Sequence, residues 1–274
     1  MHDGRARERR ALIPRELREL AEEWDRYTPL SPGMDRVETD RFVLVTGPTW
    51  ASVTGVRTDD VAATVEEVRA AARERGRTRI TWNIGPSSRP LDLEQRLRGL
   101  GLGEAAGTLL AGLALTREPE PGPPGVEVRV VDSLADFRAA SEIGWEAFAT
   151  DAERRAEKEA QLEQLWRAAR AGGAVVHFLA FADGRPAATA TGVFGSRGCF
   201  LIGGATLPWA RGRGLYRALV RARWDEAVAR GTPALAVHAQ HGTSQPILER
   251  LGFDVVCDLH ALADPPADAR RRSA

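Results

Sequence analysis

The sequence predicts an α+β protein in which a mixed, mostly antiparallel sheet is flanked by helices, and in which this arrangement occurs twice in tandem. Three observations lead to this prediction. Residues 175–207 contain three strand-like runs separated by turn signals, and an apolar pattern with helical spacing follows them. A helix–strand–helix pattern from the first half of the chain recurs in the second half. Four prolines within residues 116–125 mark an extended linker between the halves.

The second half has a complete order of elements. Ser133 is a helix N-cap, and Asp183-Gly184 and residues 196–198 are hairpin turns between strands. In chain order, the expected elements are a strand at 126–131, helices at 133–148 and 151–171, strands at 175–182, 187–194 and 199–207, a helix at 214–230, a strand at 234–240, a short helix at 244–251 and a last strand at 253–262.

The first half repeats the end of this order. Val61, Val65, Val68 and Ala72 form a helical stripe, a strand follows at residues 79–85, and Ser88-Arg89-Pro90 introduces a helix that ends at Leu100-Gly101-Leu102. The offset to the second half is 155 residues at the glycine that ends the first of these helices, 156 at the proline and 151 at the Leu-Gly step. We favour a tandem duplication over a chance similarity of two α/β segments.

Composition excludes several classes of protein. Lys+Arg and Asp+Glu are 38 each, so the net charge is zero, which argues against a strongly basic nucleic-acid binder. Two cysteines cannot form a disulfide framework, and the histidine spacing forms no metal motif. Neither a membrane-spanning apolar run nor a secretory h-region is found. We therefore expect a cytoplasmic protein with no metal, membrane or nucleic-acid partner. Lys158 is the single lysine beside 37 arginines, which is typical of a GC-rich bacterial genome.

A turn rich in glycine and arginine joins the strand ending at residue 207 to the helix that follows. Gly212 and Gly214 allow backbone N–H groups to converge, and a helix start adds unpaired donors and a positive dipole end. Arg211, Arg213 and Arg217 add positive charge. The turn is a candidate anion cradle suited to a pyrophosphate, although it is neither a Walker A loop nor the dinucleotide-binding pattern. The alternative is a plain glycine turn between strand and helix.

The order strand, proline, Arg-Gly-Arg-Gly-Leu, amphipathic helix, strand, short helix and Leu-Gly-Phe resembles the GNAT (GCN5-related N-acetyltransferase) superfamily over residues 126–262. That family carries R/Q-x-x-G-x-G/A at this turn, where backbone amides hold the pyrophosphate of acetyl-CoA. Arg211 and Gly214 match the pattern, whereas its final Gly/Ala position is Tyr216, a departure that narrows the pocket or shifts the pyrophosphate.

The resemblance implies acetyl-CoA as cosubstrate. The strand at 199–207 would pair its backbone with the pantetheine arm, and one of its N–H groups would polarise the thioester carbonyl. The cofactor-binding residues implied in this way are Gly204, Ala205, Thr206, Arg211, Gly212, Arg213, Gly214, Leu215, Tyr216, Arg217 and Ser244.

The residues that would move protons depart from the family's pattern. Many members protonate the leaving thiolate with a tyrosine four residues before the glycine of the Gly-Phe pair, where this chain has Leu248. His241, which aligns with the family's usual asparagine, Ser244 or a water would then be the acid. His238 is our first candidate for the base, because an imidazole titrates near neutrality. The alternative is a structural or surface histidine.

The helix at 133–148 borders the acceptor in this family. Glu142 and Glu146 lie one helical turn apart beside Trp145, so they could bind a cationic acceptor. The alternative is a solvated face with a core aromatic. Cys199 and Cys257 lie in apolar strands, where thiols are inert.

The first half lacks the cradle. Alignment of the two halves places Asp59-Asp60 close to Gly214-Leu215, and these carboxylates would cap the helix and repel a pyrophosphate. We therefore expect a degenerate first domain that supports the second or walls the acceptor cleft. The expected organisation is a disordered tail at 1–10, a degenerate GNAT-like domain at 11–116, a linker at 117–125, a GNAT acetyltransferase domain at 126–263 and a disordered tail at 264–274.

These observations together predict an acetyl-CoA-dependent N-acyltransferase that moves an acyl group, expected to be acetyl, to a small-molecule or peptide amine by direct attack. One alternative is a non-catalytic acyl-CoA-binding or regulatory module, because the acid tyrosine is missing. Another is an enzyme like mycothiol synthase, which has a similar tandem build. The sequence names neither the acceptor nor the oligomeric state.

Overall fold

The computed structural model describes residues 13–265, apart from the side chains of residues 106–108. The chain forms two compact units. Of the described residues, 13–114, 238–249 and 254–265 belong to one unit, and 115–237 and 250–253 belong to the other. The predicted tail at 1–10 and all but the first two residues of the predicted tail at 264–274 lie outside the described residues. Asp264, which we placed in the C-terminal tail, is instead the last residue of a strand and forms an ion pair with Arg69.

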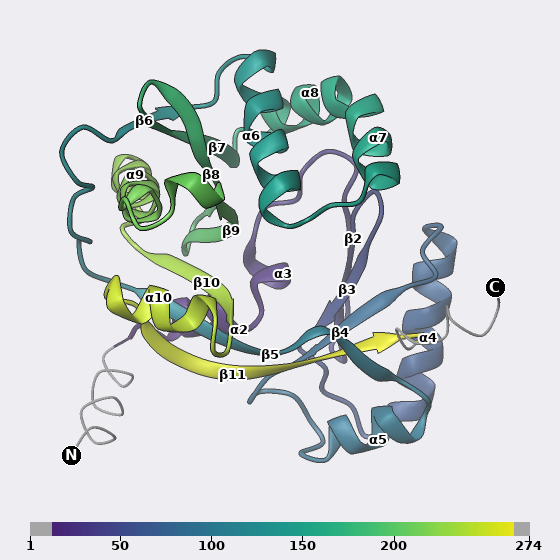
Figure 1. Ribbon diagram of the computed structural model, residues 1–274. Helices are drawn as coiled ribbons and strands as arrows, with labels where there is room; N and C mark the ends of the chain where they lie inside the picture. The colour runs from purple at the N-terminus through teal and green to yellow at the C-terminus, as the bar shows by residue number, and fades with distance from the viewer. Residues whose placement is uncertain (1–12, 266–274) are drawn as a thin grey trace. The chain divides into compact units, whose positions relative to one another are not determined.

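The unit built from residues 115–237 follows the predicted order closely (Figure 1). Its strands run β10-β9-β8-β7-β6, all antiparallel except β9 and β10. Its elements are β6 (Glu127–Val130), α6 (Leu134–Ala147), α7 (Ala152–Ala160), α8 (Leu162–Gly172), β7 (Val175–Ala182), β8 (Arg185–Gly195), β9 (Gly198–Thr206), the 3-10 turn η1 (Pro208–Ala210), α9 (Leu215–Ala229) and the start of β10 (Leu235–Gln240).

Local sequence signals account for several boundaries of this unit. The Ser133 side chain accepts a hydrogen bond from the amide of Asp136 and caps α6 as expected. Asp183 and Gly184 both have positive φ, as the tight turn of the β7–β8 hairpin requires. The predicted single helix at 151–171 is wrong, because it breaks at Gln161 into α7 and α8. No residue of α7 is buried, so packing does not hold it in line with α8, whose Leu162 is buried.

The two helical layers of this unit lie on either side of its sheet (Figure 1). The side chains of β7 and β9 that face α6 and α8 close a core around Phe137, and α9 packs on the opposite face. That core consists of Val131, Phe137, Ala140, Ile143, Leu162, Leu179, Phe181 and Ala205.

The unit that contains the first half has the strand order β1-β2-β3-β4-β11-β5, and only the β3–β4 pair is parallel. We predicted α4, β4, α5 and the C-terminal elements, but not the other helices and strands. The elements are α2 (Arg15–Glu22), α3 (Trp24–Tyr27), β1 (Asp35–Glu38), β2 (Val43–Thr46), β3 (Ala51–Thr54), α4 (Val61–Glu74), β4 (Ile80–Ile84), α5 (Leu93–Gly99), β5 (Gly103–Leu115), α10 (Ser244–Arg250) and β11 (Asp254–Asp264).

The structure contains the predicted internal repeat. In the first half, three antiparallel strands lead into α4, which crosses over to the parallel neighbour β4, and α5 and β5 follow. In the second half, β7, β8 and β9 lead into α9, which crosses over to the parallel neighbour β10, and α10 and β11 follow. The order of elements and the single parallel pair are the same in both halves.

The last strand of the second repeat pairs within the first. β11 lies between β4 and β5 and is antiparallel to both, with His260 opposite Ile84 on one side and Leu109 on the other. Leu262 packs into the core of α4 and α5 around Trp82. The compact units therefore divide the chain differently from the contiguous domains that we expected at 11–116 and 126–263. The reason is that β11 forms its backbone hydrogen bonds with β4 and β5, and that its side chains pack against α4.

Candidate functional site

The turn before α9 forms a backbone cradle at an uncapped helix start. Gly212 and Gly214 have φ of +75° and +77°, a region that residues with a Cβ rarely adopt. No side chain caps α9, and its first intrahelical bond runs from the amide of Ala218 to the carbonyl of Gly214 at 3.1 Å. The amides of Leu215, Tyr216 and Arg217 are the ones that such a helix leaves without an intrahelical acceptor. They can bind an anion.

The matching helix of the first half is closed by its own side chains. Asp60 caps α4 by accepting a hydrogen bond from the amide of Ala63 at 3.0 Å. Thr58 accepts from the amide of Asp60, and Thr64 donates to the Asp60 carbonyl at 2.8 Å. The Asp60 carboxylate thus occupies this helix start, and its negative charge opposes the binding of a pyrophosphate there.

The three arginines of the cradle are not equivalent. Arg213 forms a bidentate ion pair with Asp183 at 2.7 and 2.8 Å, which holds the pKa of that carboxyl below its usual range. Arg217 lies 3.4 Å from a carboxylate oxygen of Glu120. Arg211 donates to the Thr206 carbonyl at 3.3 Å and has no carboxylate partner among residues 13–265. Sequence reasoning counted three available positive charges, whereas the structure leaves one of them uncompensated.

The proline-rich segment that we predicted as a linker packs along α9. Arg221 forms an ion pair with Glu118 at 2.6 Å and donates to the Pro119 carbonyl at 3.2 Å. A Cβ on Gly214 would lie 2.7 Å from Cγ of Pro123. Gly214 is therefore required for two reasons, its positive φ and the close approach of the proline segment.

This segment also walls a cleft of about 210 Å³ on the flank of α9. The cleft is lined by Leu115, Arg117, Glu118, Pro119, Glu120, Arg217, Val220, Arg250, Leu251 and Gly252. Its three arginines are opposed by two glutamates, so its charge is partly balanced by the chain itself.

β9 has a bulge where the resemblance places the thioester. Thr191 of β8 lies opposite Ile202 and Thr189 lies opposite Ala205, so β9 has one extra residue between these pairs. Gly203 has φ of +62°, and residues 202–204 are exposed. The parallel ladder with β10 runs over residues 199–201 and stops there. From the bulge onward, the edge of β9 that faces away from β8 has backbone groups that can pair with an extended ligand.

Tyr216 fills the space beside this bulge. A Cβ on Gly204 would lie 2.6 Å from Cε2 of Tyr216, so a glycine on the strand matches a large residue on the helix. The GNAT family, which this sequence resembles, has a small residue, glycine or alanine, at the helix position that Tyr216 occupies. The sequence showed the departure at Tyr216, but the compensating glycine can be recognised only in the fold.

His177 and Thr191 form a polar pair that sequence reasoning missed. They are direct neighbours on β7 and β8, and Thr191 Oγ1 lies 2.8 Å from Nδ1 of His177. The ring of Phe137 meets the imidazole edge-on at 5.0 Å. Burial lowers the pKa of His177 to about 4. Thr191 is also opposite Ile202, so the pair lies in one register row with the β9 bulge, on the face that α6 covers.

The predicted acid and base candidates lie in the unit that contains residues 238–249. Nε2 of His238 lies 2.8 Å from the carbonyl of Ala21, and burial lowers the pKa of His238 to about 4. Nε2 of His241 lies 3.4 Å from a carboxylate oxygen of Asp258. Ser244 accepts a hydrogen bond from the amide of Gln240 at 2.9 Å. Leu248, at the place of the family's tyrosine, is buried.

The predicted acceptor residues lie on α6. Glu142 and Glu146 are exposed, and Trp145 packs partly buried against the core of α6 and α8. The carboxylates are thus open to a cationic ligand. Cys199 is fully buried, which raises the pKa of its thiol to about 12 and makes it a poor nucleophile.

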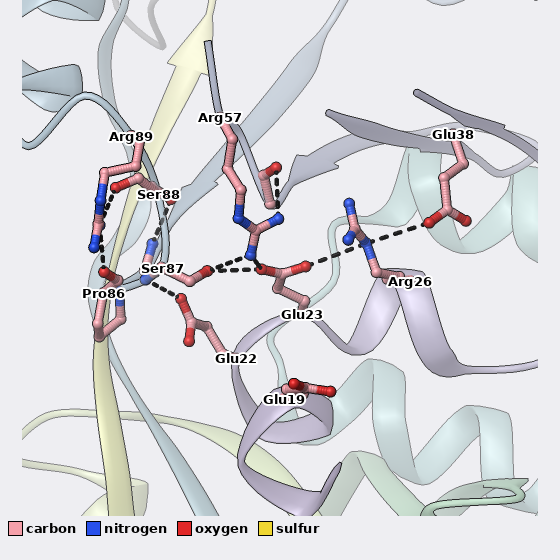
Figure 2. Close-up of polar contacts among 12 residues, drawn as sticks. Glu19, Glu22, Glu23, Arg26, Glu38, Arg57, Pro86, Ser87, Ser88 and Arg89 are labelled. Atoms are coloured by element: carbon pink, nitrogen blue, oxygen red, sulfur yellow. Dashed lines mark hydrogen bonds and ion pairs between the residues drawn. The ribbon is translucent and has the colours of Figure 1, made fainter. Parts of the chain in front are cut away.

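A second polar cluster lies in the other unit, where α2 and α3 meet the loop between β4 and α5 (Figure 2). Glu23 is buried and binds Arg57 and Ser87 through one oxygen, while Arg26 lies 3.2 Å from the other. Glu22 accepts a hydrogen bond from the amide of Ser87 at 2.6 Å. Glu23 thus pairs with two arginines, and Glu22 holds the backbone of Ser87, so the cluster fastens the loop to the helices.

No group of three or more potential metal ligands occurs within residues 13–265. Likewise, none of the helices in this part of the chain combines the length and apolar character needed to cross a membrane.

Comparison with known proteins agrees with this geometry. The sequence model of the acetyltransferase (GNAT) family matches residues 137–253. No curated protein matches the chain. A GCN5-related N-acetyltransferase from Kribbella flavida is 20% identical, with a TM-score of 0.63, and the match covers 94% of this chain and 99% of that one. A tandem GNAT protein from the clavulanic acid biosynthesis pathway is 16% identical, with a TM-score of 0.58 and coverage of 91% and 87%.

A third similar structure is a functionally unknown conserved protein from Staphylococcus epidermidis, 10% identical, with a TM-score of 0.64 and coverage of 89% of this chain and 97% of that one. At these identities, the solved structures establish the fold. The match to the tandem protein confirms the predicted α+β fold with two GNAT-like repeats.

Proposed function

We propose that the protein, of which residues 137–253 match the acetyltransferase (GNAT) family model, transfers an acyl group, expected to be acetyl, from acetyl-CoA to an amine. The single observation that carries this proposal is the uncapped start of α9. Two glycines with positive φ and the uncompensated Arg211 surround amides that suit a pyrophosphate.

The β9 bulge supplies the second part of the proposed site. In the proposal, the pantetheine arm extends along the backbone of residues 202–206, of which 202–204 are exposed, and an amide there donates to the thioester carbonyl oxygen. The amine attacks the carbonyl carbon, the C–N bond forms, and the C–S bond breaks with release of the CoA thiol. A preorganised N–H group aimed at the developing oxyanion is typically the largest electrostatic contribution to such a reaction.

The acceptor is proposed to approach over α6. Glu142 and Glu146 are exposed on that helix and would attract a cationic amine, and Trp145 lies between them in sequence. The His177–Thr191 pair lies on the same side of the sheet, next to the bulge. The attacking amine must lose a proton, and a neutral imidazole with its hydroxyl neighbour can accept it.

The experiment is an acyl-transfer assay. Purified protein is incubated with acetyl-CoA and a panel of primary amines that contains an amino acid, a diamine, an aminoglycoside and a lysine peptide. Release of free thiol together with a mass gain of one acetyl group on an amine supports the proposal.

A non-catalytic acyl-CoA-binding module is the second candidate, and Leu248 in place of the acid tyrosine favours it. That candidate predicts tight binding of acetyl-CoA with no thiol release in the presence of any amine of the panel. An enzyme like mycothiol synthase would instead be distinguished by acetylation of an amine that carries a sugar and a thiol.

A further inference from the structure

Tyr216 is a polar side chain of the cradle that the proposed function has not used. The residue lies in the first turn of α9, and its side chain extends to β9. A Cβ atom on Gly204 of β9 would lie 3.5 Å from the Tyr216 hydroxyl oxygen. The side chain is partly exposed, and its hydroxyl has no hydrogen-bond partner in the part of the chain that the structure describes. The hydroxyl is thus free to donate a hydrogen bond to a ligand at the bulge.

A buried cation lies beside this tyrosine. The guanidinium carbon of Arg223 is 5.8 Å from the centre of the Tyr216 ring, and Arg223 is only 1% exposed. Its Nε donates to the Leu219 carbonyl at 3.0 Å, and its Nη1 lies 3.5 Å from the Thr191 carbonyl. Its Nη2 has no partner, and no carboxylate pairs with it among residues 13–265. A buried positive charge without a counter-charge is costly, so it calls for an explanation.

The proposed reaction develops one negative charge at this place, which passes from the leaving thiolate to the group that protonates it. The thiolate of CoA leaves from the carbonyl carbon next to the bulge, and any donor that protonates it becomes negative itself. The charge of Arg223, whose guanidinium carbon is 5.8 Å from the centre of the Tyr216 ring, would stabilise a phenolate formed at Tyr216. Cations that stabilise charge developing in the reaction act strongly where water is excluded.

We infer that Tyr216 is the proton donor for the leaving CoA thiolate, with Arg223 as the positioning residue that stabilises the resulting phenolate. This inference rests on the proposed acyl transfer. In the step, the C–S bond breaks, the sulfur takes the phenolic proton, and the phenolate is reprotonated from water. The proton lost by the amine balances the one taken from water. The proton donor is therefore on α9 in this protein and not on α10, where Leu248 has no proton to donate.

The inference also explains the paired change of residues. A tyrosine at position 216 can reach the bulge only if the facing strand residue has no side chain, because a Cβ on Gly204 would overlap the ring at 2.6 Å. A side chain that only filled space would not require an unpaired hydroxyl or a buried cation behind its ring. Both are present here.

The test is the Tyr216→Phe variant, with Tyr27→Phe as the matched control because these are the two tyrosines of the chain. General acids typically contribute about 10²- to 10⁴-fold to a rate. A thiol with a pKa of about 8–9 leaves readily by itself, so we expect kcat to fall by only about 10- to 100-fold.

The affinity for acetyl-CoA distinguishes proton donation from packing. Calorimetry should show an unchanged Kd in Tyr216→Phe, since the ring is retained. Arg223→Met should slow the wild-type enzyme but change the rate of Tyr216→Phe little, because Arg223 acts through the phenol. Thermal melting identifies any variant that fails to fold. If Arg223→Met does not fold, Arg223→Lys takes its place, because it keeps the positive charge and should retain activity.

Three outcomes would overturn the inference. Full kcat in Tyr216→Phe, a loss of acetyl-CoA affinity equal to the loss of kcat, or an additive effect of Arg223→Met would each show that Tyr216 only packs, while acyl transfer by the wild type would still support the proposed function. Wild-type protein that binds acetyl-CoA but acetylates no amine would overturn both.

Discussion

At the scale of single residues, the buried ionisable groups determine how the protein responds to pH. Asp25 is 1% exposed, and one of its oxygens accepts a hydrogen bond from Ser52, which in turn accepts from Asn83. The other oxygen has no partner within the described residues. Burial outweighs the Ser52 hydrogen bond and the nearby Arg36 charge, and it raises the pKa of Asp25 to about 6.

This pKa predicts a loss of stability with rising pH. The folded state holds the Asp25 proton more tightly than the unfolded state, so the free energy of unfolding falls between pH 4 and pH 6 and stays low above. A shift of about two units corresponds to about 3 kcal/mol. Asp25→Asn should remove this dependence and stabilise the protein at pH 7. Urea denaturation from pH 4 to pH 8 measures both effects.

Asp35 is a control for this prediction, because its pKa is shifted in the opposite direction to that of Asp25. Its hydrogen bond to Arg75 lowers its pKa, so its contribution is present at neutral pH and is lost as the pH falls through the folded pKa. Asp35→Asn should therefore weaken the protein at neutral pH only. If Asp25→Asn keeps the wild-type dependence between pH 4 and pH 6, the assignment to Asp25 is wrong.

The arginines of the cradle should differ in their contribution to acetyl-CoA binding. Arg211 has no carboxylate partner, whereas Arg213 is already neutralised by Asp183. Hydrogen bonds to charged groups contribute about 1.5–3 kcal/mol, so Arg211→Ala should weaken binding about tenfold or more. Arg213→Ala should weaken it by less than about threefold. Calorimetry at low and high salt measures the difference, and equal losses would contradict the assignment.

Two histidines are candidates for the base. Burial lowers the pKa of both His177 and His238 to about 4, so both are neutral at pH 7. His177 is held by Thr191 in the same row as the β9 bulge, whereas Nε2 of His238 is engaged by the Ala21 carbonyl. We expect His177→Ala to lower kcat about 10- to 100-fold and His238→Ala to lower it less. The reverse order in steady-state assays would restore His238 as the base.

At the scale of elements, the start of α9 combines a ligand site with a packing contact. Gly214 has a positive φ, and a Cβ there would lie 2.7 Å from Pro123. Gly214→Ala and Gly214→Asp share this strain but differ in charge. If amides at this turn hold a pyrophosphate, Gly214→Asp should abolish acetyl-CoA binding, while Gly214→Ala should weaken it by a smaller factor. Calorimetry on both folded variants measures this difference.

Gly212→Ala separates the backbone conformation from the packing contact. Gly212 has φ of +75° and open space where a Cβ would lie. The free energy of unfolding of the variant should therefore fall by only about 1–2 kcal/mol, because of the strained φ. Gly214→Ala should lose more, because it also displaces the proline segment. Equal binding of acetyl-CoA by Gly214→Ala and Gly214→Asp would remove the pyrophosphate from this turn.

At the scale of the whole molecule, the two repeats should differ in ligand binding. The α9 start offers free amides and Arg211, whereas the α4 start is filled by Asp60 and its neighbours. Each carboxylate close to a phosphate costs on the order of 1 kcal/mol in water and more where partly desolvated. Titration of monodisperse protein should therefore give one acetyl-CoA per chain. Two equivalent sites, or one site that survives Gly214→Asp, would show that the first repeat has kept a cradle.

Much of this architecture is determined by local sequence. Ser133, Asp183-Gly184 and the glycines before α9 fix helix starts and turns through their own backbone chemistry, and the sequence therefore predicted these elements and the cradle. The repeat was also predicted, because apolar spacing and the Pro and Leu-Gly steps recur along the chain.

The tertiary structure alone decided three features, because each depends on residues far apart in sequence. β11 lies between β4 and β5, a pairing that no local pattern encodes. Asp183 and Glu120 neutralise Arg213 and Arg217, which reduces three predicted charges to one. Tyr216, which departs from the family motif, packs against Gly204, a strand residue twelve positions earlier in the sequence. Side-chain neighbours across strands and helices are set by packing, and packing is a property of the fold.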